Sequence, residues 1–125
     1  GIFVQVYKDT DLQINHALNI KNNHVIMIVS KHSRNPYLID LSQTLLRRHI
    51  PFIVFTGQNQ NRLSQNATYT IHTPFDPQSS SIQEWVFYTS LKYIFDLIYS
   101  LLYSMSYEKT KKYKQLYDQI FFKNL

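Results

Sequence analysis

Short apolar runs alternate with helical patterns along the first half of the chain. The runs have strand length and are rich in β-branched and aromatic residues. They lie at residues 3–7, 25–29, 51–55 and 68–72. Because strands that alternate with helices and read as apolar runs are typical of parallel sheets covered on both faces, we expect an α/β fold. The predicted architecture is a three-layer α/β/α arrangement around a mostly parallel four-stranded sheet.

Polar residues at defined positions predict where the intervening helices begin. Thr10 followed by Gln13 matches a capping box, and Asn22 and Asn23 close that helix. Asn35 before Pro36 suits the start of a second helix, because proline at the first helical position gives up no intrahelical hydrogen bond. That helix has leucines at 38, 41 and 45 and ends near residue 49, and residues 62–66 form one more helical turn.

Two long helices are expected in the C-terminal part of the chain. A connection rich in proline and serine follows residue 72, and Ser81 with Glu84 forms a second capping box. Apolar positions at helical spacing then continue to residue 105, and a final helix covers about residues 107–122.

The segment 85–105 is apolar enough to raise the question of a membrane span. Lys92 and Asp96 near its middle argue against one, since each would cost about 3 kcal/mol at a bilayer centre. A buried helix is the better interpretation. Its aromatic and leucine-rich surface either completes the core of one chain or forms an interface with a second copy.

Composition narrows the class of protein. A chain of 125 residues with 44% hydrophobic and 17% charged residues fits one globular domain and excludes a disordered chain. There is no cysteine, which excludes disulfides and a thiolate metal site and fits the cytoplasm. The net charge is +5, but the lysines of residues 106–125 are typical of a solvated helix face rather than a DNA-reading surface. We expect no cofactor, no metal and no secretory signal.

The loop Ser30–Asn35 concentrates the candidate chemistry. It joins a predicted strand to a predicted helix and contains hydroxyl, amide, imidazole and basic side chains beside the N–H groups of a helix start. Such a site favours a phosphate or a carboxylate. The alternative is an ordinary polar loop whose asparagine only caps the helix.

Several stretches in the same order resemble the SIS (sugar isomerase) domain, in particular the effector domain of RpiR-type bacterial transcriptional regulators. One is VIMIVSKHSRN, which resembles an apolar strand followed by Ser-x-Ser-Gly-x-Thr. PYLIDLSQTLLRRH followed by IPFIVFT resembles the helix and the strand that come next in the family. NRLSQNATYTIHT is similar to the family's Ser-Pro-Leu-Ala-x-x-Ala-Asp segment and its last strand. The long helix with Asp96 and the basic helix after it complete the resemblance.

The resemblance implies that the loop holds the phosphate of a phosphorylated sugar. Ser30 matches the first serine of the pattern and Thr56 matches the threonine after the next strand. His32 replaces the second serine of the pattern, Ser33 replaces its glycine and Asn35 replaces its threonine. Three positions of this chain therefore differ from the family pattern. Losing the glycine adds a side chain where the phosphate would approach. The predicted ligand-binding residues are Ser30, His32, Ser33, Arg34, Asn35 and Thr56.

The resemblance also implies that residues 1–125 form a partial domain. An SIS domain has a flavodoxin-like fold that opens with a further strand and helix, and RpiR-type regulators have a helix-turn-helix DNA-binding domain upstream; neither is expected within this chain. In the family's sheet the missing strand lies between the counterparts of residues 3–7 and 25–29. We therefore expect these two segments to pair directly, or a partner chain to fill the gap.

The function expected from these observations is a phosphosugar-sensing and dimerisation domain, cytoplasmic and homodimeric, with DNA contacted only through the separate domain. One alternative is a degenerate assembly domain that binds no ligand. Another is a phosphosugar isomerase, for which Glu84 and His32 are the candidate acid–base residues. Glu84 is already assigned to a helix cap, so we expect no enzymatic activity.

Overall fold

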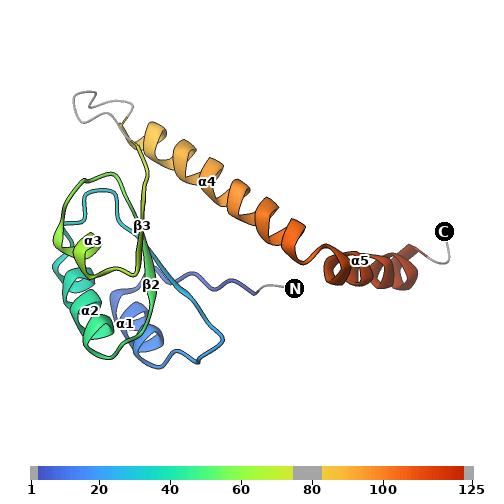
Figure 1. The fold of residues 1–125 in the computed structure, drawn as a ribbon, viewed down its shortest axis with the longest axis horizontal. Helices are drawn as coiled ribbons and strands as arrows, with labels where there is room; N and C mark the ends of the chain where they lie inside the picture. Colours follow the sequence, from blue (N-terminus) through green and yellow to red (C-terminus); the bar gives the residue numbers. More distant parts are fainter. Residues whose placement is uncertain (1–2, 75–82, 123–125) are drawn as a thin grey trace. The chain divides into compact units, whose positions relative to one another are not determined.

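The structure is a computed structural model that describes residues 3–74 and 83–122 (Figure 1). Its elements in chain order are α1 (Thr10–Leu18), β1 (Ile26–Val29), α2 (Pro36–Arg47), β2 (Phe52–Thr56), α3 (Arg62–Asn66), β3 (Tyr69–His72), α4 (Gln83–Met105) and α5 (Tyr107–Phe122). The chain divides into two compact units. One is Val6–Leu91, and the other comprises the described parts of Gly1–Gln5 and Lys92–Leu125.

A parallel three-stranded sheet forms the centre of the unit Val6–Leu91. The strand order is β1-β2-β3, so β2 is paired on both sides. Ile26 lies opposite Phe52, and Ile53 lies opposite Tyr69. The central position explains why β2 is an unbroken apolar run, because both of its faces are largely removed from water. The predicted α/β class and parallel sheet are confirmed.

The predicted fourth strand, at residues 3–7, is wrong. These residues do not pair with any strand in the described part of the chain, and the side chain of Phe3 is 84% exposed. The expected direct pairing with β1 is therefore also absent. Tyr7 is held against α1 instead: the side-chain amide of Gln13 donates to the Tyr7 carbonyl at 2.6 Å, and the Tyr7 ring stacks on His16. A β-prone sequence forms a strand only where a sheet edge receives it.

The hydrophobic core lies on one face of the sheet. Ile28, Phe52 and Val54 project from β1 and β2 into a cluster with residues of α1, α2 and α3. The helical members of this cluster are Ala17, Leu41, Leu45 and Leu63. Residues of all three helices therefore pack against the same face of the sheet. The leucine spacing predicted for α2 is confirmed, because Leu41 and Leu45 are both buried.

The helix caps were predicted correctly for α2 and incorrectly for α1. Asn35 caps α2, its side-chain oxygen accepting from the Tyr37 N–H at 3.0 Å. The cap of α1 is Asp9, which accepts from the Leu12 N–H at 3.1 Å, and Thr10 is the first helical residue. A carboxylate at this position also interacts favourably with the helix dipole. The helix ends at Leu18, before the two asparagines expected to close it.

The opposite face of the sheet is covered unevenly. Phe55 is fully buried, whereas Met27 and Val29 of β1 remain exposed. Phe87 and Leu91, in the first part of α4, are buried within the unit Val6–Leu91. The predicted capping box of Ser81 and Glu84 lies outside the residues and side chains that the structure describes.

The two C-terminal helices have nearly the predicted bounds, and one residue separates them. Among residues 3–74 and 83–122, no helix is both long enough and apolar enough to cross a membrane.

Candidate functional site at the carboxyl edge of the sheet

Three loops meet where the parallel strands end. Because all three strands point the same way, the loops after β1, β2 and β3 leave from one edge, which is where open α/β sheets bind ligands. The Gly57 N–H donates to the Lys31 carbonyl at 3.0 Å, and the Thr73 N–H donates to the Thr56 carbonyl at 2.7 Å. The His72 ring nitrogen Nε2 lies 3.2 Å from the Gly57 carbonyl. These contacts join the loops into one connected structure.

Two of the predicted ligand-binding residues bind each other. The hydroxyl oxygens of Ser33 and Thr56 lie 2.6 Å apart, and both residues are buried. Thr56 Oγ1 also accepts from the Gln58 N–H at 3.1 Å. Ser33 and Thr56 are 23 positions apart in the sequence, so their hydrogen bond fixes the loop after β1 against the end of β2.

Ser33 has a left-handed backbone with φ of 52°. This is the position where the resembled loop pattern has glycine, the residue that adopts such angles without steric cost. For a residue with a Cβ the conformation costs roughly 1–2 kcal/mol. The buried hydrogen bond to Thr56 offsets a cost of this size. The loop therefore turns through a left-handed residue without glycine.

The other predicted site residues lie at the surface or close to it. His32, Arg34 and Asn35 are exposed, and Ser30 is half-buried. The Asn35 side chain is engaged as the cap of α2, and the Asn35 backbone carbonyl accepts from the Ile39 N–H at 3.1 Å. Pro36 has no N–H. The start of α2 therefore offers fewer amide groups to a ligand than the sequence suggested, and side chains are left as the main anion-binding groups.

The charge at this edge favours an anion. The loop segments 30–35 and 56–61 and the described residues 72–74 contain no aspartate or glutamate. They contain Lys31 and Arg34, together with His32 and His72. Carboxylates are the usual ligands of hard cations, and within the described ranges no group of three or more histidine, aspartate or glutamate side chains could hold a metal ion. The chemistry that fits these side chains is charge-assisted hydrogen bonding to phosphate or carboxylate oxygens.

A separate surface cavity between α1 and α2 has the opposite character. It has a volume of about 180 Å³ and is lined by Ile14, Leu18 and Leu41, with Asp40 as its acidic residue. An apolar wall with a carboxylate does not suit a phosphate, so this cavity does not compete with the carboxyl edge as an anion site.

Sequence reasoning missed two residues at this edge. His72 reaches the Gly57 carbonyl across from β3, and Thr73 is completely buried beside Thr56. The Thr73 hydroxyl has no hydrogen-bond partner within the part of the chain that the structure describes. The only signal for either residue was its place directly at the end of a predicted parallel strand.

The comparisons with known proteins agree with this fold. The SIS domain family matches residues 1–101. The match covers most of the chain, and the chain belongs to the SIS domain family.

Among solved structures, the chain is similar to the Vibrio vulnificus NanR protein complexed with ManNAc-6P, with a TM-score of 0.64 and 22% sequence identity. The superposition covers 91% of this chain and 44% of that chain, so the chain spans less than half the length of this neighbour. At this identity the likeness establishes the fold. No curated protein sequence matches the chain.

Proposed function

We propose that this chain is the phosphosugar-sensing and dimerisation domain of an RpiR-type bacterial transcriptional regulator, with the sugar phosphate held at the loop Ser30–Asn35. The observation that carries the proposal is the carboxylate-free, basic edge at which three loops are joined by backbone hydrogen bonds. Membership of the SIS family and the likeness to NanR, a protein solved with ManNAc-6P, support the same ligand class.

The side chains divide into two roles in this proposal. Ser30, His32 and Arg34 bind the phosphate; His32 and Arg34 are exposed, and Ser30 is half-buried. Arginine can bind two phosphate oxygens at once, which makes Arg34 the largest expected contributor. Ser33 and Thr56 are positioning residues that hold the loop in shape through their mutual hydrogen bond. Asn35 fixes the start of α2 below the site.

The proposal extends to the protein around this domain. We propose a cytoplasmic homodimer whose DNA contacts come from a helix-turn-helix domain elsewhere in the polypeptide. We also propose that the complete SIS domain has a three-layer, flavodoxin-like fold, whose sheet has more strands than the three described here.

The proposed domain is not an enzyme. Sugar isomerisation needs a general base within hydrogen-bond reach of the proton it moves. Of the two candidate bases, His32 is an exposed loop residue, and Glu84 is predicted to cap a helix. An assay for aldose–ketose conversion tests this: we expect no conversion, and conversion that is lost in Glu84→Gln would establish an isomerase instead.

A second candidate is an assembly domain that binds no ligand. It is favoured by the hydrogen bonds that already occupy Ser33, Asn35 and Thr56. The two proposals differ in whether Arg34 and Ser30 have a ligand.

Calorimetric titration with a panel of sugar phosphates, ManNAc-6P among them, distinguishes the candidates. We expect one sugar phosphate to bind and to raise the melting temperature, because a ligand that binds only the folded state stabilises it. Arg34→Gln should weaken binding by about tenfold, or about 1.4 kcal/mol, since charge-assisted hydrogen bonds are lost.

The matched control is Arg47→Gln, which removes the same charge at the other end of α2. We expect this variant to bind as the unchanged chain does. If no sugar phosphate binds, or if both variants weaken binding equally, the basic edge is not a specific site and the assembly domain is the better account.

A further inference from the structure

The surface cavity between α1 and α2 has a chemical character that the proposed sensing function does not use. It lies within the unit Val6–Leu91 and has a volume of about 180 Å³. The residues that line it are Ile14, Leu18, Tyr37, Asp40, Leu41 and Thr44. A mostly apolar lining with a single charged group is the usual composition of a site for a small molecule.

Helical spacing explains why these side chains meet. The four lining residues of α2 lie at i, i+3, i+4 and i+7, so they share one stripe of that helix, and the two from α1 are one turn apart. Leu41 is buried in the core cluster, whereas Asp40 is exposed. The cavity therefore extends from the edge of the hydrophobic core outward to a charged rim.

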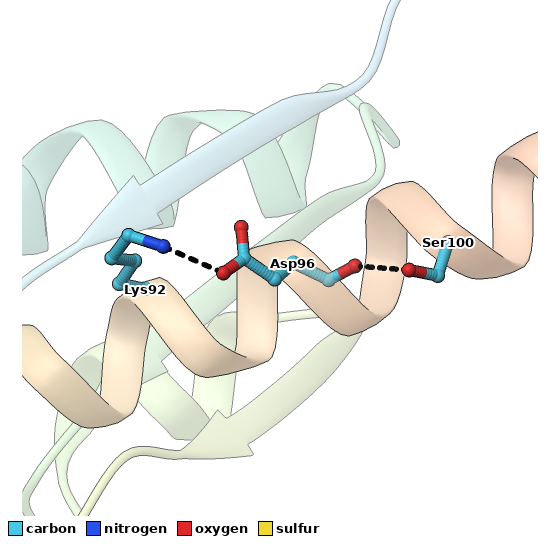
Figure 2. Close-up of polar contacts among 3 residues, drawn as sticks. All are labelled: Lys92, Asp96 and Ser100. Carbon is cyan, nitrogen blue, oxygen red and sulfur yellow. Dashed lines mark hydrogen bonds and ion pairs between the residues drawn. The ribbon is translucent and has the colours of Figure 1, made fainter.

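The Asp40 carboxylate forms no ion pair or hydrogen bond within the part of the chain that the structure describes. The Thr44 hydroxyl, one turn further on, donates to the Asp40 backbone carbonyl at 3.1 Å and not to its carboxylate. Asp96 in α4 shows the usual alternative, because Lys92 one turn earlier donates to its carboxylate at 2.7 Å (Figure 2). The matching position in α2 is Pro36, which has no donor. The Asp40 carboxylate is thus available to a cationic ligand.

The charge around this carboxylate limits the ligand to a single positive charge. Residues 12–75 contain six lysines and arginines, and Asp40 is their only acidic residue, so the segment has a net charge of +5 (six positive against one negative). An ammonium group at Asp40 forms one ion pair. A second ammonium on the same ligand would find no further carboxylate in this segment and would be repelled by the basic side chains.

The volume of the cavity limits the length of the ligand. Taking the share of liquid volume of one water molecule, about 30 Å³, for each non-hydrogen atom, a cavity of 180 Å³ holds about six such atoms. An aliphatic amine with five carbons has this size. Its hydrocarbon chain would lie against Ile14, Leu18 and Leu41, with its ammonium at the rim.

The Tyr37 ring adds a second attraction for the same ammonium. Tyr37 and Asp40 both line the cavity and are three residues apart in α2, which makes their side chains neighbours on the helix surface. The face of an aromatic ring attracts a cation through its electron density. A carboxylate, an aromatic ring and an aliphatic wall together favour an alkylammonium over a neutral molecule of the same shape.

We propose that the cavity between α1 and α2 binds a small aliphatic amine with one ammonium group and about five carbons. The ammonium pairs with Asp40, and the hydrocarbon chain fills the apolar part of the cavity. This site goes beyond the proposed sensing function. None of its lining residues belongs to the predicted sugar-phosphate site, and the argument holds whether or not the basic edge binds a ligand.

An NMR titration of the isotope-labelled chain with pentylamine and, separately, with 1-pentanol tests the proposal. We expect pentylamine to move the amide signals of residues 14, 18, 37, 40, 41 and 44 with a Kd on the order of 1 mM, because a ligand of so few atoms binds weakly. Pentanol has the same length without the charge and should bind about fivefold more weakly, the upper range for an exposed ion pair. No shifts at these residues up to about 20 mM pentylamine, or equal binding of the two compounds, would overturn the proposal.

Two neutralised variants test the assignment to Asp40. Asp40→Asn should weaken pentylamine binding about fivefold and leave pentanol binding unchanged. Asp11→Asn is the matched control, since it removes the same charge from the first turn of α1, outside the cavity. We expect the control to bind pentylamine as the unchanged chain does. Equal weakening by both variants would mean that only the overall charge matters and would contradict the site.

A variant that fills the cavity tests where the hydrocarbon chain lies. Ile14→Phe places a ring in the apolar part of the cavity, and we expect it to abolish binding of both pentylamine and pentanol. Circular dichroism checks that the variant keeps its helices. Unchanged pentylamine binding in folded Ile14→Phe would show that the ligand lies elsewhere.

Two further amines test which source of ammonium fits the site. The compound 1,5-diaminopentane carries a second charge at its apolar end and should bind at least about tenfold more weakly than pentylamine, because an unpaired charge is costly in an apolar cavity. The lysine derivative N-acetyl-lysine methylamide represents a lysine side chain of a partner protein, and we expect it to be weaker as well. If the diamine bound as tightly as pentylamine, the limit to one charge would be wrong. If the lysine derivative did, the cavity would be a docking point for a polypeptide and the small-amine proposal would fail.

Discussion

Leu45 and Leu101 both lie in helices with regular apolar spacing, yet their surroundings are opposite. Leu45 in α2 is 0% exposed, within the core cluster of the unit Val6–Leu91. Leu101 in α4 is 63% exposed. Spacing alone predicts that a helix has an apolar side, but it does not tell what that side contacts. In the first region the sheet provides the contact, and for the second the homodimer proposed above is the candidate.

The two regions also differ in chemistry. The unit Val6–Leu91 has the basic loop edge with its network of hydrogen bonds, whereas residues 92–122 have an exposed aromatic and aliphatic surface. In the function we propose, the first region holds the ligand and the second is the candidate surface for assembly. Substitutions that test this separation should have effects that differ between the regions.

The largest effect is expected from Leu45→Ala. Removing a fully buried leucine leaves a cavity, and the free energy of unfolding should fall by about 3 kcal/mol. Leu101→Ala is the matched change in α4, and in the monomer it should cost less than about 0.5 kcal/mol because the side chain is exposed. Urea denaturation at a concentration too low for dimerisation measures both. Equal losses would mean that α4 is packed within the single chain.

Ser33→Ala should have the next largest effect. It removes the buried hydroxyl that binds Thr56, and we expect a loss of about 1–2 kcal/mol in unfolding free energy. Ser33→Gly loses the same hydrogen bond but removes the steric cost of the left-handed backbone, so it should be the milder of the two. Thermal unfolding followed by circular dichroism ranks them. A glycine variant less stable than the alanine variant would contradict the role assigned to this backbone angle.

Asn35→Ala tests the start of α2. Losing the side-chain cap should cost about 1 kcal/mol, because the Tyr37 N–H is left without its acceptor. Asn35→Asp is the control: it keeps a capping oxygen and should retain most of the stability. Denaturant midpoints of the two variants provide the measurement. If the alanine variant were as stable as the unchanged chain, Asn35 would be available to a ligand and would not be a structural cap.

The smallest effect is expected from Lys92→Ala. Its ion pair with Asp96 is at the surface, with side-chain exposures of 78% and 65%, and such pairs contribute about 0.5 kcal/mol or less. The change in melting temperature should be barely measurable and should vanish at high salt. A larger loss would indicate that this ion pair is covered by protein and not by water.

Much of the fold could be predicted from the sequence. The leucine spacing of α2, the three apolar strands and both C-terminal helices follow from hydrophobic periodicity, and the start of α2 follows from its cap. The error at residues 3–7 came from β propensity, which says that a segment fits a sheet but not that a sheet edge is present to receive it. The error at Thr10 came from two possible caps in neighbouring positions, of which Asp9 forms the hydrogen bond.

The candidate site was only partly predictable. The position of the loop Ser30–Asn35 at the carboxyl edge followed from the order of strands and helices. The hydrogen bond between Ser33 and Thr56 could not be predicted from the sequence, because it joins residues 23 positions apart and depends on a Ser33 backbone angle that serine rarely adopts. Thr73 was missed because nothing in a loop sequence shows which hydroxyl will be buried without a partner.

The most direct test of the central claim is an NMR titration of the isotope-labelled chain with ManNAc-6P, run beside the same sugar without its phosphate. If the basic edge binds a sugar phosphate, amide shifts should move at residues 30–35, 57–58 and 72–73, only with the phosphorylated sugar, and should leave residues 92–122 unchanged. Unchanged spectra, or shifts confined to α4 and α5, would contradict the account.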